Sequence, residues 1–145
     1  IGNDDFILLE SDLIFEKNAI LSLLSNQATD IMLCSDVIKF QDSYFIEYND
    51  KHQLVNCSVN ESELNVCGEL VGIHKISNNF YKNLCEYYST IQNLKPKLGY
   101  EYALLHLAQT KIPVHVLKVI NLKWYEIDDD KDLEFAEKNI IAFLN

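Results

Sequence analysis

Two acidic segments, each directly after a predicted strand, contain the residues best suited to chemistry. Near the start of the chain the sequence reads LLESD, which ends in Asp12. Near the end it reads YEIDDD, which contains Glu126 and Asp128. In open α/β sheets, carboxylates at the carboxyl ends of strands are placed to hold a hard cation such as Mg²⁺ over a phosphate. The sequence therefore predicts a metal site.

Both acidic segments also have a structural interpretation. Acids such as Asp128 and Asp130 directly before a helical pattern favour the positive end of the helix dipole, and for DDD taken alone this is the better explanation. The same interpretation is weaker for Asp12, because apolar residues flank it on both sides. Burying an isolated carboxylate is costly, so Asp12 needs either water or a cation.

The composition indicates one globular domain, residues 1–145, with a real core: 48% of the residues are hydrophobic. The 22 acidic and 12 basic residues give a formal net charge of −10, which repels nucleic-acid phosphates and anionic lipid surfaces. No apolar run approaches the roughly 20 residues of a membrane span, and the N-terminus has no signal-peptide pattern. We expect no nucleic-acid or membrane partner and a cytoplasmic location.

The cysteines and histidines have no spacing that suggests a metal or redox site. The four cysteines contain no CxxC pair, so we expect reduced packing residues. The four histidines are equally scattered, and we expect them to face solvent or to form structural hydrogen bonds.

Hydrophobic periodicity predicts the elements that must hold the acids. The predicted strands are a buried strand of parallel type at 6–9, a strand at 30–35, an antiparallel meander within 36–59 that uses VIKF, YFIEY and QLVNCSV, and strands at 68–76 and 113–120. The predicted helices are 16–26, 77–93 with Ser77 as N-cap, and 100–110, and residues 122–145 pass from strand to helix. This order favours a mixed α/β fold with an open sheet.

Four segments together resemble successive motifs of the sugar-phosphate nucleotidyltransferase superfamily, on its phosphocholine and 2-aminoethylphosphonate cytidylyltransferase branch. They are FILLESDLIFEKNAI, GELVGIHKIS, GYEYALLHLA and LKWYEIDDDKDLEFAEKNI. The resemblance spans nearly the whole chain and implies a GT-A-like, Rossmann-like open mixed sheet with flanking helices. It also implies a Mg²⁺-dependent enzyme that joins CTP to a phosphocholine- or aminoethylphosphonate-like acceptor and releases pyrophosphate.

The resemblance also implies roles for particular residues. The acids Asp12, Glu126 and Asp128 would gather the catalytic Mg²⁺, with Asp12 and Asp128 as the catalytic pair. Aromatic faces and a carboxylate would hold a cationic head group. The residues at acceptor-side positions are Tyr44, Phe45, Tyr100, Glu101 and Trp124. Because the chain has eight tyrosines, core packing is the alternative for any one of these aromatic residues.

One part of the family pattern is missing. The glycine-rich nucleotide-binding loop that precedes the LLESD strand in the family has no counterpart among the four glycines of this sequence. The chain also begins with Ile1 rather than methionine, which suggests a piece of a longer protein; simple processing or a trimmed tag is the alternative explanation. We therefore expect an acceptor- and metal-binding part without the N-terminal nucleotide-binding part, inactive by itself. Its unpaired edge at 6–9 would favour a homodimer.

Two other functions remain open from the sequence. One is a sugar-1-phosphate nucleotidyltransferase, which hydroxyl-binding Asn and Gln side chains in the pocket would favour. The other is a non-catalytic assembly or sensing module of the same fold, which a pocket without convergent acids would favour.

Overall fold

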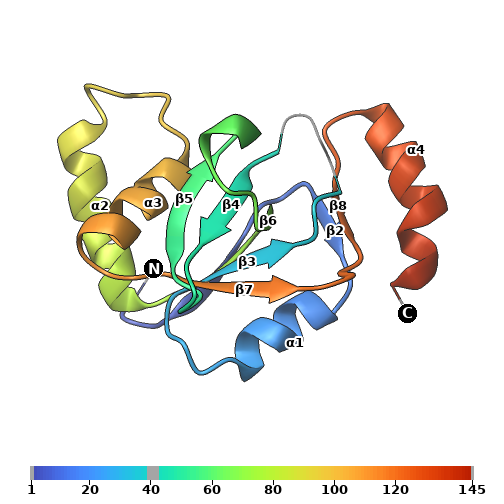
Figure 1. Cartoon of the computed structure of the whole chain (residues 1–145), viewed down its shortest axis with the longest axis horizontal. Helices are drawn as coiled ribbons and strands as arrows, with labels where there is room; N and C mark the ends of the chain where they lie inside the picture. Colours follow the sequence, from blue (N-terminus) through green and yellow to red (C-terminus); the bar gives the residue numbers. More distant parts are fainter. Residues whose placement is uncertain (1, 39–42, 145) are drawn as a thin grey trace.

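A six-stranded mixed sheet forms the centre of the structure, a computed structural model that describes residues 2–38 and 43–144. Its strands are β1 (Phe6–Leu9), β3 (Ile31–Ser35), β4 (Phe45–Tyr48), β5 (Leu54–Ser58), β6 (Gly68–Ile76) and β7 (His115–Val119). Their order is β5-β4-β6-β3-β7, and β1 pairs with β6 beside this path (Figure 1). The pair β3 and β7 is parallel, whereas β6 runs antiparallel to β1, β3 and β4.

A second, two-stranded sheet and the helices surround this centre. The small sheet pairs β2 (Leu13–Phe15) with β8 (Trp124–Glu126). The helices are α1 (Asn18–Ser25), α2 (Asn78–Ile91), α3 (Tyr100–Thr110) and α4 (Asp130–Asn139), with short 3₁₀ helices at Glu61–Glu63 and Ile141–Phe143. In Figure 1, α4 lies at the opposite end of the molecule from α2 and α3. None of the helices in the described residues combines the length and apolar character needed to cross a membrane.

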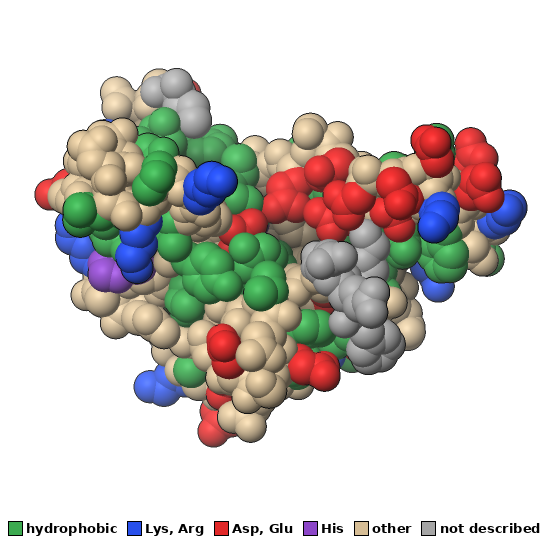
Figure 2. All heavy atoms as spheres, turned by 90° about the horizontal axis from the view of Figure 1, so that it is seen from above, with side chains coloured by type: hydrophobic (Ala, Val, Ile, Leu, Met, Phe, Trp, Pro, Cys, Tyr) green, Lys and Arg blue, Asp and Glu red, His purple; other side chains and the backbone are tan. Residues whose placement is uncertain are grey.

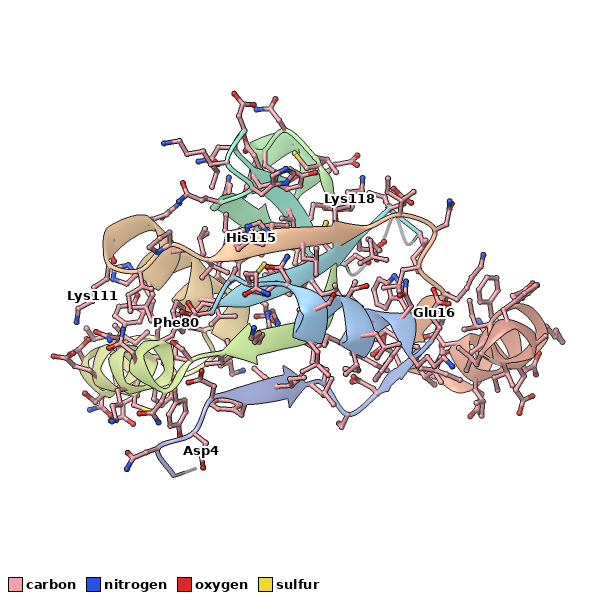
Figure 3. The ribbon with its side chains drawn as sticks, turned by 90° about the horizontal axis from the view of Figure 1, so that it is seen from below. Asp4, Glu16, Phe80, Lys111, His115 and Lys118 are labelled. Carbon is pink, nitrogen blue, oxygen red and sulfur yellow. The ribbon has the colours of Figure 1, made fainter. Side chains whose placement is uncertain are left out.

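The large sheet is covered on both faces, which explains why β3, one of its central strands, is buried along its whole length and mostly apolar. Successive side chains of a strand point to opposite faces. Along β3, Met32 packs into a cluster with Phe80 of α2, whereas Leu33 packs into a second cluster with Leu23 of α1. Figure 3 views the molecule from the side on which α1 lies over the sheet. The protein therefore has three layers, with α2 and α3 on the face opposite α1.

The predicted start of α2 is confirmed. The Ser77 hydroxyl accepts a hydrogen bond from the backbone N–H of Phe80 at 3.0 Å. The carboxylate of Asp30, directly before β3, accepts bonds from both the backbone N–H and the hydroxyl of Ser77, at 2.7 and 3.0 Å. This N-cap therefore also ties α2 to the sheet.

Three expectations about the strands need correction. Strand β1 is antiparallel to β6 and only partly buried, because it lies at an edge of the large sheet rather than between two parallel neighbours. The predicted meander is a β4–β5 hairpin: residues 37–38 are not in a strand, and residues 39–40 lie outside the described part. Strand β2 was not predicted, because three residues are too few to show a period.

The cysteine prediction is confirmed in part. Cys34 and Cys57 are buried and free, and burial raises the pKa of each thiol to about 12. Cys85 is exposed, so it is not a packing residue. Within the described residues β1 pairs with β6 alone, which leaves its other edge open; self-association through this edge stays a prediction.

Gly68 begins β6 at a point where a side chain has no room. A Cβ there would lie 2.2 Å from the Ser35 carbonyl oxygen and 2.4 Å from Cys34 Sγ. We expect Gly68→Ala to lower the free energy of unfolding by about 1–3 kcal/mol, measured by denaturant titration. Gly2→Ala is the matched control, because its Cβ would have its nearest neighbour at 3.9 Å. Equal stability of the two variants would contradict this account.

Candidate functional site

The connection between the two sheets fixes the acidic segment that follows β1. The backbone N–H of Glu10 donates to the Gly72 carbonyl at 3.1 Å and so continues the β1–β6 pairing. Two residues later, the Asp12 carbonyl accepts from the backbone N–H of Ile127 at 2.9 Å and so begins the β2–β8 pairing. The backbone of residues 10–12 is therefore held at both ends.

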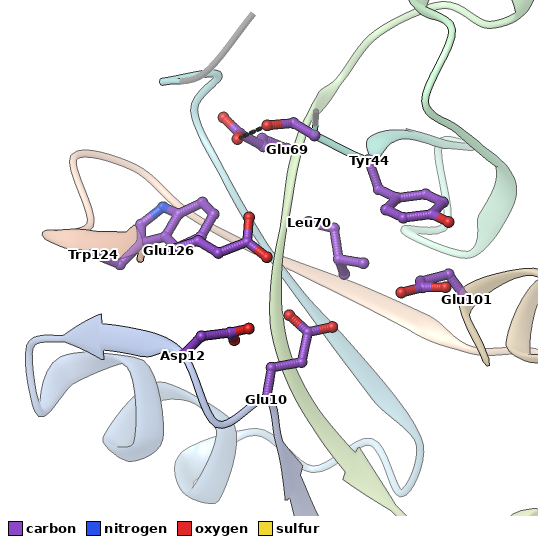
Figure 4. A pocket seen from close by; sticks show the side chains of 9 residues that line it. Glu10, Asp12, Tyr44, Glu69, Leu70, Glu101, Trp124 and Glu126 are labelled. Atoms are coloured by element: carbon purple, nitrogen blue, oxygen red, sulfur yellow. Dashed lines mark hydrogen bonds between the residues drawn. The ribbon is translucent and has the colours of Figure 1, made fainter. Parts of the chain in front are cut away.

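Three carboxylates meet at this junction. One oxygen from each of Glu10, Asp12 and Glu126 lies within 4.8 Å of the others, and in Figure 4 the three side chains point toward one another. Ligands on opposite sides of a Mg²⁺ ion, at about 2.1 Å each, are about 4.2 Å apart. Hard carboxylate oxygens at this spacing fit Mg²⁺ or Mn²⁺, with water completing the shell.

Gly72 makes room for Glu10. Its φ of 74° lies in the left-handed region that favours glycine. A Cβ at this position would lie 2.2 Å from Glu10 Oε2, so any other residue would displace the carboxylate. Gly72 is therefore part of the site.

A buried hydrogen-bond chain leads away from Glu10. The Tyr100 hydroxyl donates to Glu10 Oε1, and the same hydroxyl oxygen lies 3.0 Å from His74 Nε2. Burial raises the pKa of Glu10; the Tyr100 hydrogen bond lowers it, and the charge of Asp12 raises it further. Burial also lowers the pKa of His74 to about 3, so this imidazole is neutral at physiological pH.

The carboxylates line a cavity of about 270 Å³. Figure 2 shows acidic side chains gathered in a band from the middle of one face toward the side of α4. The lining residues are Glu10, Asp12, Ser43, Tyr44, Glu69, Leu70, Glu101, Trp124 and Glu126. Among these described residues there is no lysine or arginine, so the cavity is strongly anionic.

Glu101 is an unusual member of this lining. The residue is only 7% exposed, and its Oε2 has no hydrogen-bond partner among the described residues. Burial raises the pKa of Glu101, and the charge of Glu10 adds to this, while the Tyr44 hydroxyl lowers it. Burial and the charge of Glu101 raise the pKa of Tyr44 to about 12. A buried carboxylate with an unpartnered oxygen gains most from a cationic or hydrogen-bond-donating ligand.

Two other lining side chains are held by the protein itself. Glu69 accepts hydrogen bonds from the Ser43 hydroxyl and from the backbone N–H of Ile38, both at 2.6 Å. The indole N–H of Trp124 donates to the Ser35 hydroxyl at 2.8 Å, which fixes the ring at the cavity wall. These residues shape the cavity.

Of the predicted metal ligands, the structure brings Asp12 and Glu126 together but not Asp128. Asp128 is exposed, and its backbone N–H donates to Asp132 Oδ2 at 3.1 Å. Within the described residues it is outside the converging group, so its metal and catalytic roles stay predictions. Its neighbour Asp129 caps α4, which agrees with the structural interpretation of this segment.

Of the predicted acceptor-binding residues, most lie at the cavity and one does not. Tyr44, Glu101 and Trp124 line the cavity, and Tyr100 reaches it through its bond to Glu10. Phe45 is 3% exposed within β4 and does not line the cavity, because the alternation along the strand turns it away from its neighbour Tyr44.

Glu10 and Glu69 belong to the site but are not predicted from the sequence. The signal for Glu10 was present, because Glu10 and Asp12 are two residues apart in LLESD. Using this signal requires a prediction that the chain passes from the large sheet to the two-stranded sheet between these two acids. Glu69 lies inside an apolar strand and has no comparable signal.

Comparison with solved structures identifies the fold. The chain is similar to the inositol-1-phosphate CTP transferase from T. maritima, with a TM-score of 0.75 and 17% identity over 99% of this chain and 57% of that one. It is similar to the CTP:phosphocholine cytidylyltransferase from Streptococcus pneumoniae, with a TM-score of 0.69 and 13% identity over 91% and 56%. A CMP:2-keto-3-deoxy-manno-octonic acid synthetase gives a TM-score of 0.60 and 17% identity over 95% and 62%.

The chain therefore has the mixed α/β, Rossmann-like fold of the nucleotidyltransferases, as predicted. It spans a little more than half the length of these solved structures. No protein-family model matches the sequence.

We expect the metal-free chain to lose stability as the pH rises above the usual carboxyl range. The raised pKa values of Glu10 and Glu101 mean that the folded state holds these protons more tightly than the unfolded chain. The resulting stabilisation is complete below the ordinary value of 4.5 and is lost as the pH rises through the raised values. The melting temperature of Glu101→Gln should therefore fall less than that of the wild type between about pH 5 and about pH 8.

The control for this measurement is Glu137→Gln, an exposed change on α4 that should keep the wild-type dependence. A Glu101→Gln profile parallel to that of the control would show that the buried carboxylate does not carry the effect.

Proposed function

We propose that this chain is the acceptor- and metal-binding part of a Mg²⁺-dependent nucleotidyltransferase, specifically a cytidylyltransferase. The reaction would join CTP to a phosphocholine- or aminoethylphosphonate-like acceptor. An acceptor oxygen attacks the α-phosphorus of CTP, a P–O–P bond forms, and the bond to pyrophosphate breaks. The observation that carries the proposal is the convergence of Glu10, Asp12 and Glu126 at one cavity of a nucleotidyltransferase fold.

The proposed metal site suits the charge of the substrates. A bound Mg²⁺ would neutralise phosphate charge and align the two anions, which is most of what phosphoryl-type transfer requires. Without a cation, the carboxylates of Glu10, Asp12 and Glu126 would repel any phosphate that entered the cavity. These three residues would therefore hold the metal, with no protein nucleophile needed.

The proposed acceptor site lies across the cavity from Asp12 and Glu126. Tyr44 and Glu101 are on that side (Figure 4), and the buried Oε2 of Glu101 lacks a partner in the described residues. An ammonium head group would satisfy this carboxylate and contact the aromatic ring. The Trp124 ring, fixed by its bond to Ser35, lies on the opposite side of the cavity, the side of Asp12 and Glu126 (Figure 4).

The alternatives from the sequence have less support. A sugar phosphate would be favoured by Asn or Gln side chains in the pocket, and the described lining residues include neither. A non-catalytic module would be favoured by the absence of convergent acids, whereas three converge here. The similarity to an inositol-1-phosphate CTP transferase keeps a neutral polyol phosphate as the competing acceptor to test.

Paired substitutions test the metal site. We expect Asp12→Asn to weaken Mn²⁺ or Mg²⁺ binding at least about tenfold, measured by calorimetry, because it removes a charged ligand. The melting temperature without metal should stay equal or rise, because repulsion of Glu10 is relieved. Asp128→Asn should have a smaller effect on binding, because Asp128 lies outside the converging group.

A structural role for Asp12 predicts the reverse pattern, a lower melting temperature with metal binding unchanged. Equal loss of binding in Asp128→Asn and Asp12→Asn would instead favour the metal ligands predicted from the sequence, Asp12, Glu126 and Asp128.

Acceptor binding tests the proposed substrate. In the presence of Mg²⁺, we expect the chain to bind phosphocholine more tightly than 3,3-dimethylbutyl phosphate, in which carbon replaces the cationic nitrogen. Glu101→Gln should reduce this preference at least about tenfold, because it removes the charge that faces the ammonium. Tighter binding of glucose-1-phosphate or inositol phosphate than of phosphocholine would overturn the choline-type acceptor while leaving nucleotidyl transfer in place.

A further inference from the structure

The hydrogen-bond chain behind Glu10 runs from the cavity into the core. Its first member, Glu10, belongs to the converging carboxylates, and its last, His74, is 1% exposed. Tyr100, the first residue of α3, joins them: its hydroxyl contacts Glu10 Oε1 on one side and His74 Nε2 at 3.0 Å on the other. The rings of Tyr100 and His74 meet edge to face at 90°, with centroids 5.5 Å apart.

The two hydrogen bonds that link His74, Tyr100 and Glu10 run in one direction. An ionised carboxylate only accepts hydrogen bonds, so the single proton of the Tyr100 hydroxyl is donated to Glu10. The hydroxyl oxygen is then an acceptor, and His74 must carry its proton on Nε2. Nδ1 of His74 is left as a bare acceptor, and it is indeed the ring nitrogen without a partner in the described residues. Both dipoles therefore point toward Glu10.

This arrangement restricts a flexible side chain. A glutamate has three rotatable bonds, and ordering it at a metal site costs conformational entropy. Here the Tyr100 bond holds one carboxylate oxygen, and the absence of a side chain at Gly72 leaves space for the other. Hydrogen-bonded partners behind metal-binding carboxylates typically contribute 10–100-fold in metal affinity.

We infer that Tyr100, supported by His74, is a positioning residue that presents Glu10 to the divalent cation. The inference rests on the metal site of the proposed function. It gives α3 two separate tasks on adjacent residues, because Tyr100 would act on the metal side of the cavity and Glu101 on the acceptor side. It also gives the buried His74 a role as the donor that fixes the direction of the Tyr100 hydroxyl.

Mn²⁺ titration followed by electron paramagnetic resonance tests this on the chain itself, without substrates. Tyr100→Phe keeps the ring and removes the hydroxyl, and we expect it to weaken Mn²⁺ binding by about 10–100-fold. In a Glu10→Ala background the same substitution should change binding by less than about twofold, because the side chain that Tyr100 contacts is then absent. Tyr87→Phe is the control, since Tyr87 stacks on His106 away from the cavity and should bind as wild type.

The outcomes separate the inference from the proposal on which it rests. Wild-type affinity in Tyr100→Phe, or full additivity with Glu10→Ala, would overturn the positioning role and leave the metal site intact. Failure of the wild-type chain to bind Mn²⁺ would overturn both.

A second pair of variants applies if circular dichroism shows that Tyr100→Phe does not fold. His74→Gln keeps an N–H donor and should retain most of the Mn²⁺ affinity, whereas His74→Leu removes the donor and should weaken binding severalfold. Equal affinities in these two variants would overturn the inference.

Discussion

The antiparallel pairing of β2 with β8 is the contact on which the acidic site depends. It consists of three residue pairs that place Leu13 opposite Glu126, and the bond between Asp12 and Ile127 extends it. A shift of one residue would turn Glu126 to the opposite face, because side chains alternate along a strand. Trp124 strengthens the arrangement, since its bond to Ser35 ties the small sheet to β3 of the large one.

Bringing carboxylates together opposes folding, because they repel one another and lose water. Hydrogen bonds from the protein compensate some of these carboxylates more than others. From the described residues Glu69 receives hydrogen bonds from Ser43 and Ile38, and Glu10 receives one from Tyr100. Glu101 is buried with one oxygen unpartnered in the described residues. A ligand that binds only the folded state adds to stability, so a cation bound in this cavity would also stabilise the fold.

The layered core explains how distant segments form one cavity. Strand β6 lies at the centre of the large sheet, and it supplies Glu69 and Leu70 to the cavity and Gly72 to the space beside Glu10. Helix α3 packs through Leu104 on the face of the sheet to which Leu70 belongs. The helix also carries Glu101 to the cavity edge. The apolar contacts that hold α3 therefore also set the distance across the cavity.

The sequence by itself determined the α/β class, the long central strand β6, the Ser77 cap and two of the three converging acids. These follow from local patterns: continuous apolar runs, a capping side chain, and carboxylates directly after or at the end of strands. Only the tertiary structure decided that Glu10 rather than Asp128 joins Asp12 and Glu126, and that Tyr44 rather than Phe45 faces the cavity. The physical reason is that side-chain direction depends on strand register, which β2 is too short to reveal and which pairing with the distant β8 sets.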